Sequence, residues 1–109
     1  MAVDSQMLKG ILDGCILKII SKGEIYSAQI VEYMKSVGFI DFSEGTLYPL
    51  LLRLEREGCF EIRKESNSLG PARKFYKLSL NGIKQLELFL SKWNDFLTLV
   101  SKILEDKNE

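Results

Sequence analysis

Apolar residues at alternating steps of three and four run through the last quarter of the sequence, and this spacing limits the possible folds more than any other feature. Such steps form one continuous seam along an α-helix, as in a coiled-coil heptad. The seam consists of Ile83, Leu86, Leu90, Trp93, Leu97, Val100 and Leu104, and a second row contains Phe89, Phe96 and Ile103. Ser79 can cap a helix over residues 79–106, which at 1.5 Å per residue is about 40 Å long and longer than a small domain is wide. Such a helix must pack against a partner, so we expect a homodimer.

The segment from Ser43 to Gly58 is predicted to form another amphipathic helix, because serine caps helices and glycine ends them. Its core stripe is formed by Leu47, Leu50, Leu51 and Leu54. The opposite face carries Gly45, Pro49, Leu52 and Arg56, with Thr46 and Arg53 flanking it. A small residue, a hydroxyl and two guanidinium groups on one face indicate a contact surface. Pro49 leaves two alternatives: it interrupts the helix if Ser43 is the cap, or it lies in the first turn if the regular helix begins near Thr46.

Two more helices are predicted upstream, the first from Asp4 or Ser5 to about residue 22 and the second from about Ser27 to residue 38. Gly10 and Gly14 stand on one side of the first helix, where each glycine costs about 1 kcal/mol relative to alanine. The close approach of another helix, room for a ligand, or neutral tolerance would each account for them.

The pattern changes to period two after Gly58, which predicts a β-hairpin with a turn at residues 66–72. Its strands carry five cations, Arg63, Lys64, Arg73, Lys74 and Lys77, against Glu61 and Glu65, a local charge of +3. This basic hairpin is typical of a nucleic-acid contact, although ordinary solvated strands also carry such charges.

Composition excludes several classes of protein. At 109 residues the chain is expected to form a single domain, and its 15 basic residues balance its 15 acidic residues, so any nucleic-acid site depends on local clustering. The chain has no histidine, and Cys15 and Cys59 stand far apart as expected buried thiols, so we expect no metal, no cofactor and no enzymatic activity. We expect no signal peptide, and no apolar run reaches membrane-spanning length, so we expect a cytoplasmic protein without a membrane partner.

The order of these elements predicts an α+β, mostly helical fold: a winged helix-turn-helix over residues 5–78, followed by the long helix over 79–106. In such a unit the second helix of the pair enters the major groove of double-stranded DNA and the wing follows the backbone. The residues expected to contact DNA are Ser43, Gly45, Thr46, Tyr48, Pro49, Arg53, Arg56, Lys64, Arg73 and Lys74. The alternative is a winged-helix module that binds protein and not DNA.

Several stretches resemble the PadR family of bacterial transcriptional regulators: Leu8-Lys9-Gly10, Gly23-Glu24-Ile25-Tyr26, SEGTLYPL from Ser43, Arg53-Leu54-Glu55, GPARKFYKLS from Gly70, and the region of Trp93. The resemblance covers nearly the whole chain and implies a homodimeric winged-helix repressor whose first and last helices form the dimer. The implied dimer residues are Leu8, Ile11, Leu86, Leu90, Trp93, Leu97, Val100 and Leu104. Ser27 departs from the glycine that the family often has after the turn tyrosine, and the wing tip carries less charge than in many members.

The short-tailed branch of that family includes regulators with an apolar pore at the dimer interface, where tryptophans of the last helices hold flat aromatic compounds. The resemblance therefore implies a small planar aromatic effector that relieves repression. The residues implied for it are Gly14, Leu17, Trp93, Phe96 and Leu97, with the carboxylate of Asp95 near enough to suit a cationic drug. The alternative is that Trp93 fills a heptad position of an ordinary core.

Overall fold

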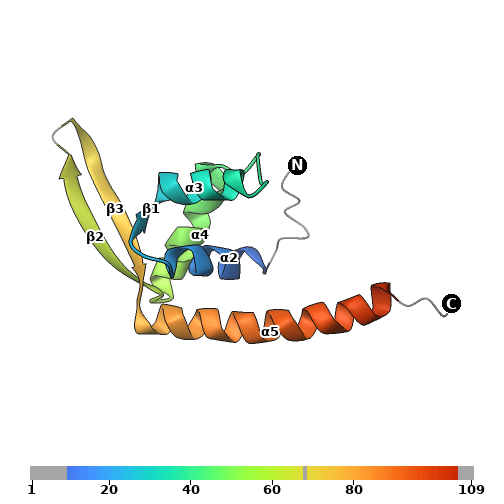
Figure 1. The fold of residues 1–109 in the computed structure, drawn as a ribbon. Helices are drawn as coiled ribbons and strands as arrows, with labels where there is room; N and C mark the ends of the chain where they lie inside the picture. Colours follow the sequence, from blue (N-terminus) through green and yellow to red (C-terminus); the bar gives the residue numbers. More distant parts are fainter. Residues whose placement is uncertain (1–9, 68, 106–109) are drawn as a thin grey trace.

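The computed structural model describes residues 10–67 and 69–105, which form four helices and a three-stranded antiparallel sheet (Figure 1). The elements in chain order are α2 (Leu12–Ile20), β1 (Ile25–Tyr26), α3 (Ser27–Ser36), α4 (Glu44–Arg56), β2 (Phe60–Asn67), β3 (Gly70–Leu78) and α5 (Leu80–Leu104). In Figure 1 the hairpin of β2 and β3 projects away from the helices, and α5 lies along α2 and continues beyond it. The prediction of a mostly helical α+β winged helix-turn-helix with a long C-terminal helix is confirmed.

One hydrophobic core holds α2, α3 and α4 together and extends to the base of the sheet. Its side chains come from the apolar stripes that the sequence shows, with Phe42 of the connection between α3 and α4 fully buried among them. The predicted stripe of α4 is buried throughout: Leu47, Leu50, Leu51 and Leu54. Because this inner face is fixed in the core, the residues between these leucines must point outward.

The helix α4 begins at Ser43, whose side chain accepts a hydrogen bond from the Thr46 N–H at 3.4 Å. This cap decides between the two alternatives for Pro49, which lies inside the helix. A proline there has no N–H to donate to the carbonyl of Gly45 four residues earlier. Both residues are exposed, so water can satisfy that carbonyl.

The helix α2 is shorter at its start than the predicted helix over this region, because Gly10 and Ile11 form a turn. It begins at Leu12, and Gly10 lies in a turn with a φ of +86°, a conformation that glycine adopts readily. The predicted start at Asp4 or Ser5, and Leu8 with its dimer role, lie outside the described residues. At Gly14, a Cβ atom would collide with the ring of Phe89 on α5. The close approach of a helix is therefore the reason for this glycine.

The strand β1 was not predicted, because two residues are too short to show a period. Ile25 and Tyr26 lie just before the predicted second helix, and their backbones pair with Tyr76 and Phe75 of β3, giving the order β1-β3-β2. Tyr26 rather than Ser27 is the residue that precedes α3, and its N–H donates to Gln29 Oε1 at 3.1 Å. The wing is thus joined to the first residues of the helix-turn-helix pair.

The helix α5 is attached to the turn after α4 by its first residues. Ser79 accepts a hydrogen bond from the Gly82 N–H at 3.0 Å, as predicted for a cap, and its hydroxyl donates to the Gly58 carbonyl at 2.7 Å. Asn81 donates to the Glu57 carbonyl at 2.9 Å. Gly82 is buried against the backbone carbonyl of Cys59. These contacts fix the direction in which the long helix leaves the domain.

The heptad seam of α5 is buried at only one position. Leu86 faces the core, whereas the later seam residues are exposed: Leu90, Trp93, Leu97, Val100 and Leu104. Residues 91–100 are exposed without exception.

The two cysteines are free, as expected. Cys59 is buried and Cys15 is half-buried, and burial raises the pKa of both thiols. Across the described ranges, no helix is long and apolar enough to cross a membrane, and no cluster of residues could hold a metal ion.

Candidate nucleic-acid interface

The outer face of α4 presents the residues that the sequence assigned to it. Ser43, Gly45, Thr46, Pro49 and Arg56 are exposed. Tyr48 is 56% exposed, and the hydroxyls of Ser43 and Thr46 lie 3.4 Å apart at the start of the helix. The first two turns of α4 therefore offer hydroxyl groups, apolar surface and the carboxylate of Glu44, but no guanidinium or amide side chain.

Arg53, although predicted to contact DNA, is hydrogen-bonded to carboxylates within the protein. Its Nη1 and Nη2 atoms donate to the two carboxylate oxygens of Asp13 at 2.8 and 2.7 Å, and Nη1 also lies 3.6 Å from Glu57 Oε2. The hydrogen bonds to Asp13 raise the pKa of Arg53. The sequence could not show this pair, since Asp13 on α2 is 40 residues away and meets α4 only through the fold. We therefore infer that Arg53 stabilises the packing of α4 against α2.

Arg63 of the wing is likewise neutralised by its neighbours. Its guanidinium donates to Glu24 at 3.2 and 2.8 Å and to Glu65 at 2.7 Å, and it lies 4.4 Å from the centre of the Phe75 ring. The hydrogen bond from Arg63 lowers the pKa of Glu24. Arg63 connects the wing to the turn before β1, and its charge is matched by carboxylates.

The remaining cations of the wing site differ in how far they are paired. Lys64 and Lys74 stand directly opposite each other in the β2–β3 register. Like charges at directly opposite positions of a sheet repel each other. Lys74 lies 3.5 Å from Glu55, and the Arg73 guanidinium lies 4.2 Å from the Tyr26 ring. Neither Lys64 nor Arg73 has an ion pair within the described residues.

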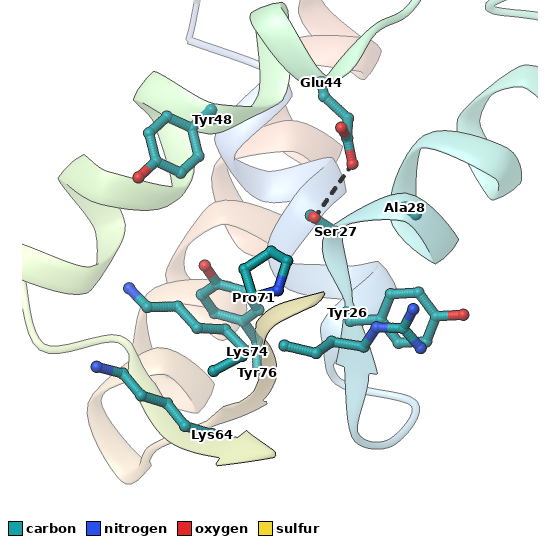
Figure 2. Close-up of a pocket in the computed structure, with 11 residues that line it drawn as sticks. Tyr26, Ser27, Ala28, Glu44, Tyr48, Lys64, Pro71, Lys74 and Tyr76 are labelled. Carbon is teal, nitrogen blue, oxygen red and sulfur yellow. Dashed lines mark hydrogen bonds between the residues drawn. The ribbon is translucent and has the colours of Figure 1, made fainter. Parts of the chain in front are cut away.

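These cations and the start of α4 border one concave site of about 740 Å³ (Figure 2). It is lined by Tyr26, Ser27, Ala28, Glu44, Tyr48, Lys64, Pro71, Ala72, Arg73, Lys74 and Tyr76. Four predicted residues meet here: Tyr48, Lys64, Arg73 and Lys74. Ser27 and Glu44 were not predicted as site residues, and their side chains are hydrogen-bonded at 3.3 Å in this site. For Glu44, the sequence offered one signal of a role in the site: its position next to the predicted cap Ser43.

The residues assigned to an effector are only partly brought together. Gly14 and Trp93 line an apolar cavity of about 340 Å³ between α2, the end of α3 and α5. Leu17 lines a different cavity of about 260 Å³, whereas Phe96 and Leu97 line neither cavity and are exposed on α5. Trp93 stacks on Phe89, with ring centres 6.4 Å apart. The charged residues at the larger cavity are Lys18 and Lys22, and Asp95 does not line it.

The family model of the Transcriptional regulator PadR-like family matches residues 16–88, which include the helix-turn-helix pair, the wing and the start of α5. The chain belongs to the PadR-like family of transcriptional regulators. It is therefore a DNA-binding regulator and not an enzyme.

Solved PadR-like structures have the same architecture. A PadR-like transcriptional regulator from Bacillus cereus is 44% identical and has a TM-score of 0.82, with 94% of this chain and 100% of that chain covered. A PadR-like transcription factor from Bacteroides fragilis is 34% identical with a TM-score of 0.79, covering 91% and 95% of the two chains. Bacillus subtilis PadR, solved in complex with operator DNA, is 28% identical with a TM-score of 0.65, covering 73% of this chain and 46% of its own.

Substitutions at two arginines of α4 are expected to have different effects on stability and DNA binding in this PadR-like protein. Arg53→Ala leaves Asp13 without its partner and should lower the free energy of unfolding by about 1 kcal/mol, because a partly exposed ion pair contributes that much at most. Arg56→Ala should leave stability within about 0.5 kcal/mol and weaken DNA binding, because Arg56 is exposed and has no ion pair in the described chain. Urea denaturation and fluorescence anisotropy on labelled duplexes measure the two effects. Stronger loss of DNA affinity in Arg53→Ala than in Arg56→Ala would contradict this assignment.

Proposed function

We propose that the protein is a homodimeric repressor that binds an inverted-repeat operator. The observation that carries this proposal is the meeting of Lys64, Arg73 and Lys74 with the exposed start of α4 around one concave site. The determination of Bacillus subtilis PadR with operator DNA supports the same mode of binding here. The outer face of α4 enters the major groove, and the wing cations contact the adjacent phosphates.

The exposed apolar face of α5 supports a dimer. Trp93, Leu97 and Val100 are 36, 49 and 46% exposed, although they belong to one heptad seam. A long row of apolar side chains in water is unfavourable, and pairing with a second copy removes it from solvent. Two protomers joined in this way place two copies of α4 on successive half-sites.

Leu97→Glu is expected to produce monomers, because it places a charge in the middle of this apolar face. Sedimentation velocity should show the change in mass, and affinity for a two-half-site duplex should fall at least tenfold because a monomer loses the second contact. Lys84→Glu, an exposed position nearer the start of α5, serves as the control and should remain dimeric. A dimeric Leu97→Glu variant would place the interface elsewhere.

The operator is tested by footprinting the DNA upstream of the protein's own gene, with and without candidate compounds. The expected result is a pair of inverted half-sites about one helical turn apart. Binding should weaken steeply with salt, because lysine and arginine contacts release counterions. Absence of binding even at low salt would favour the alternative, a winged-helix module that binds a protein.

The effector is proposed to be a small planar aromatic compound that binds near Trp93. The apolar cavity and the exposed indole support this proposal. Such a compound stacks on the indole and changes its emission. Titration of planar aromatic compounds with the fluorescence of Trp93 as readout tests it, since this is the only tryptophan of the chain. Unchanged emission across the series would remove the effector from the proposal.

A further inference from the structure

The DNA-facing site contains one carboxylate among its described lining residues, that of Glu44. The other charged residues that line it are Lys64, Arg73 and Lys74. A negative charge that faces phosphates weakens binding to every DNA sequence. A carboxylate on this surface is compatible with tight binding only if it meets a hydrogen-bond donor of the DNA.

The position of Glu44 matches that requirement. It is the first residue of α4, and base contacts in a helix-turn-helix come from the N-terminal residues of the second helix. Its Oε1 atom accepts a hydrogen bond from the Ser27 hydroxyl at 3.3 Å, which orients the carboxylate (Figure 2). In the described part of the chain Glu44 has no ion pair, so its second oxygen is available to a ligand.

The edges of the bases determine which donor such a carboxylate can bind. In the major groove cytosine presents an N4 amino group, whereas guanine and thymine present acceptors that repel a carboxylate. Adenine presents an amino group beside the acceptor N7, which makes it a poorer partner for two negatively charged oxygens. Cytosine is therefore the base that Glu44 favours.

We propose that Glu44 is a specificity-determining residue that accepts a hydrogen bond from the N4 amino group of a cytosine in each operator half-site. This proposal rests on the operator binding proposed above. It makes Ser27 a positioning residue, because the serine hydroxyl orients the carboxylate before DNA binds. The serine that departs from the family's frequent glycine thereby gains a role in reading the operator.

Glu44→Gln tests the proposal by changing the donor and acceptor pattern without changing the size of the side chain. Glutamine pairs with the N6 and N7 atoms of adenine. Selection from a random duplex library should therefore return a cytosine at one half-site position for the parent protein and an adenine there for Glu44→Gln. On fixed duplexes, the variant should lose about tenfold affinity for the cytosine operator relative to the adenine operator.

Glu32→Gln is the matched control, since it removes the same charge from an exposed position of α3 that does not line the site. It should leave base preference unchanged. If Glu44→Gln binds all duplexes more tightly with unchanged preference, Glu44 only repels phosphate and the proposal is wrong. If the parent protein selects no consensus at all, the proposed operator binding fails, which is a separate result. Ser27→Ala should weaken the preference for cytosine while the preferences at other positions persist.

Discussion

Replacing Gly82 with alanine is expected to lower the free energy of unfolding by about 3 kcal/mol, because this buried position has no room for a methyl group. The added Cβ would collide with the backbone carbonyl of Cys59 and press against Leu78 at 3.2 Å. A backbone carbonyl cannot rotate away as a side chain can, and this one also accepts the Ser79 N–H at 2.9 Å. The first turn of α5 must therefore shift, and the hydrogen bonds of Ser79 and Asn81 to the preceding turn must weaken. Urea denaturation monitored by circular dichroism measures the loss.

Gly45→Ala provides the matched control, because it makes the same change inside another helix. A Cβ at Gly45 meets nothing closer than Ser43 Oγ at 3.6 Å, which is an ordinary contact. Alanine is favoured over glycine in a helix, so this variant should gain up to about 1 kcal/mol. We therefore expect the free energy of unfolding to fall in Gly82→Ala and to rise in Gly45→Ala. Equal stability of Gly82→Ala and the parent protein would mean that α5 is not held against Cys59.

The double variant Lys64→Ala with Arg73→Ala is expected to weaken operator binding by about 10- to 100-fold near 0.1 M salt. The salt slope, that is, the slope of the logarithm of the binding constant against the logarithm of the salt concentration, should fall in magnitude by about two. Both residues line the site, and neither has an ion pair in the described chain. Base preference should persist, because phosphate contacts carry no sequence information. Loss of Lys64 also removes the repulsion from Lys74, so stability should not fall through this pair. Fluorescence anisotropy at several salt concentrations measures the slope.

Arg63→Ala is the control from the same wing. Its guanidinium is already bound by Glu24 and Glu65 and by the Phe75 ring. Arg63 should therefore neutralise no phosphate and release few DNA counterions on binding. We expect little change in the salt slope and a modest loss of stability. A reduction of the slope equal to that of the double variant would show that Arg63 leaves its carboxylate partners to contact DNA.

Much of the fold follows from periodicity in the sequence. The buried leucines of α4, the cap at Ser43, the hairpin and the long helix all agree with the patterns that predicted them, because each depends on neighbours within one element. The two-residue strand β1 and the turn at Gly10 before α2 were not predictable in this way. Pairing of β1 with β3 depends on residues about 50 positions away, and a left-handed glycine at Gly10 resembles any other glycine in a sequence.

The candidate site, like the fold, was only partly predictable from the sequence. The exposed residues of α4 and the basic residues of the wing could be predicted, since side-chain type and face suffice for them. Which charges are already paired could not be predicted: Arg53 and Lys74 have carboxylate partners in α2 and α4, and these meet only in three dimensions. Gly14 was considered for a ligand, and the ring of Phe89 occupies the space beside it. From composition alone, every basic residue would be considered free to contact DNA.

The helix α5 is held near its start by three contacts: Gly82 against Cys59, Leu86 in the core, and Phe89 against Gly14. From Phe89 to Leu104 the helix extends about 22 Å further at 1.5 Å per residue. A tilt of about 8° at this attachment moves the far end by about 3 Å, close to the 3.4 Å rise of one base pair. In the proposed dimer, such a tilt would alter the distance between the two recognition helices by a step that DNA can distinguish. The packing of α5 against α2 would then determine which spacing of operator half-sites the dimer fits.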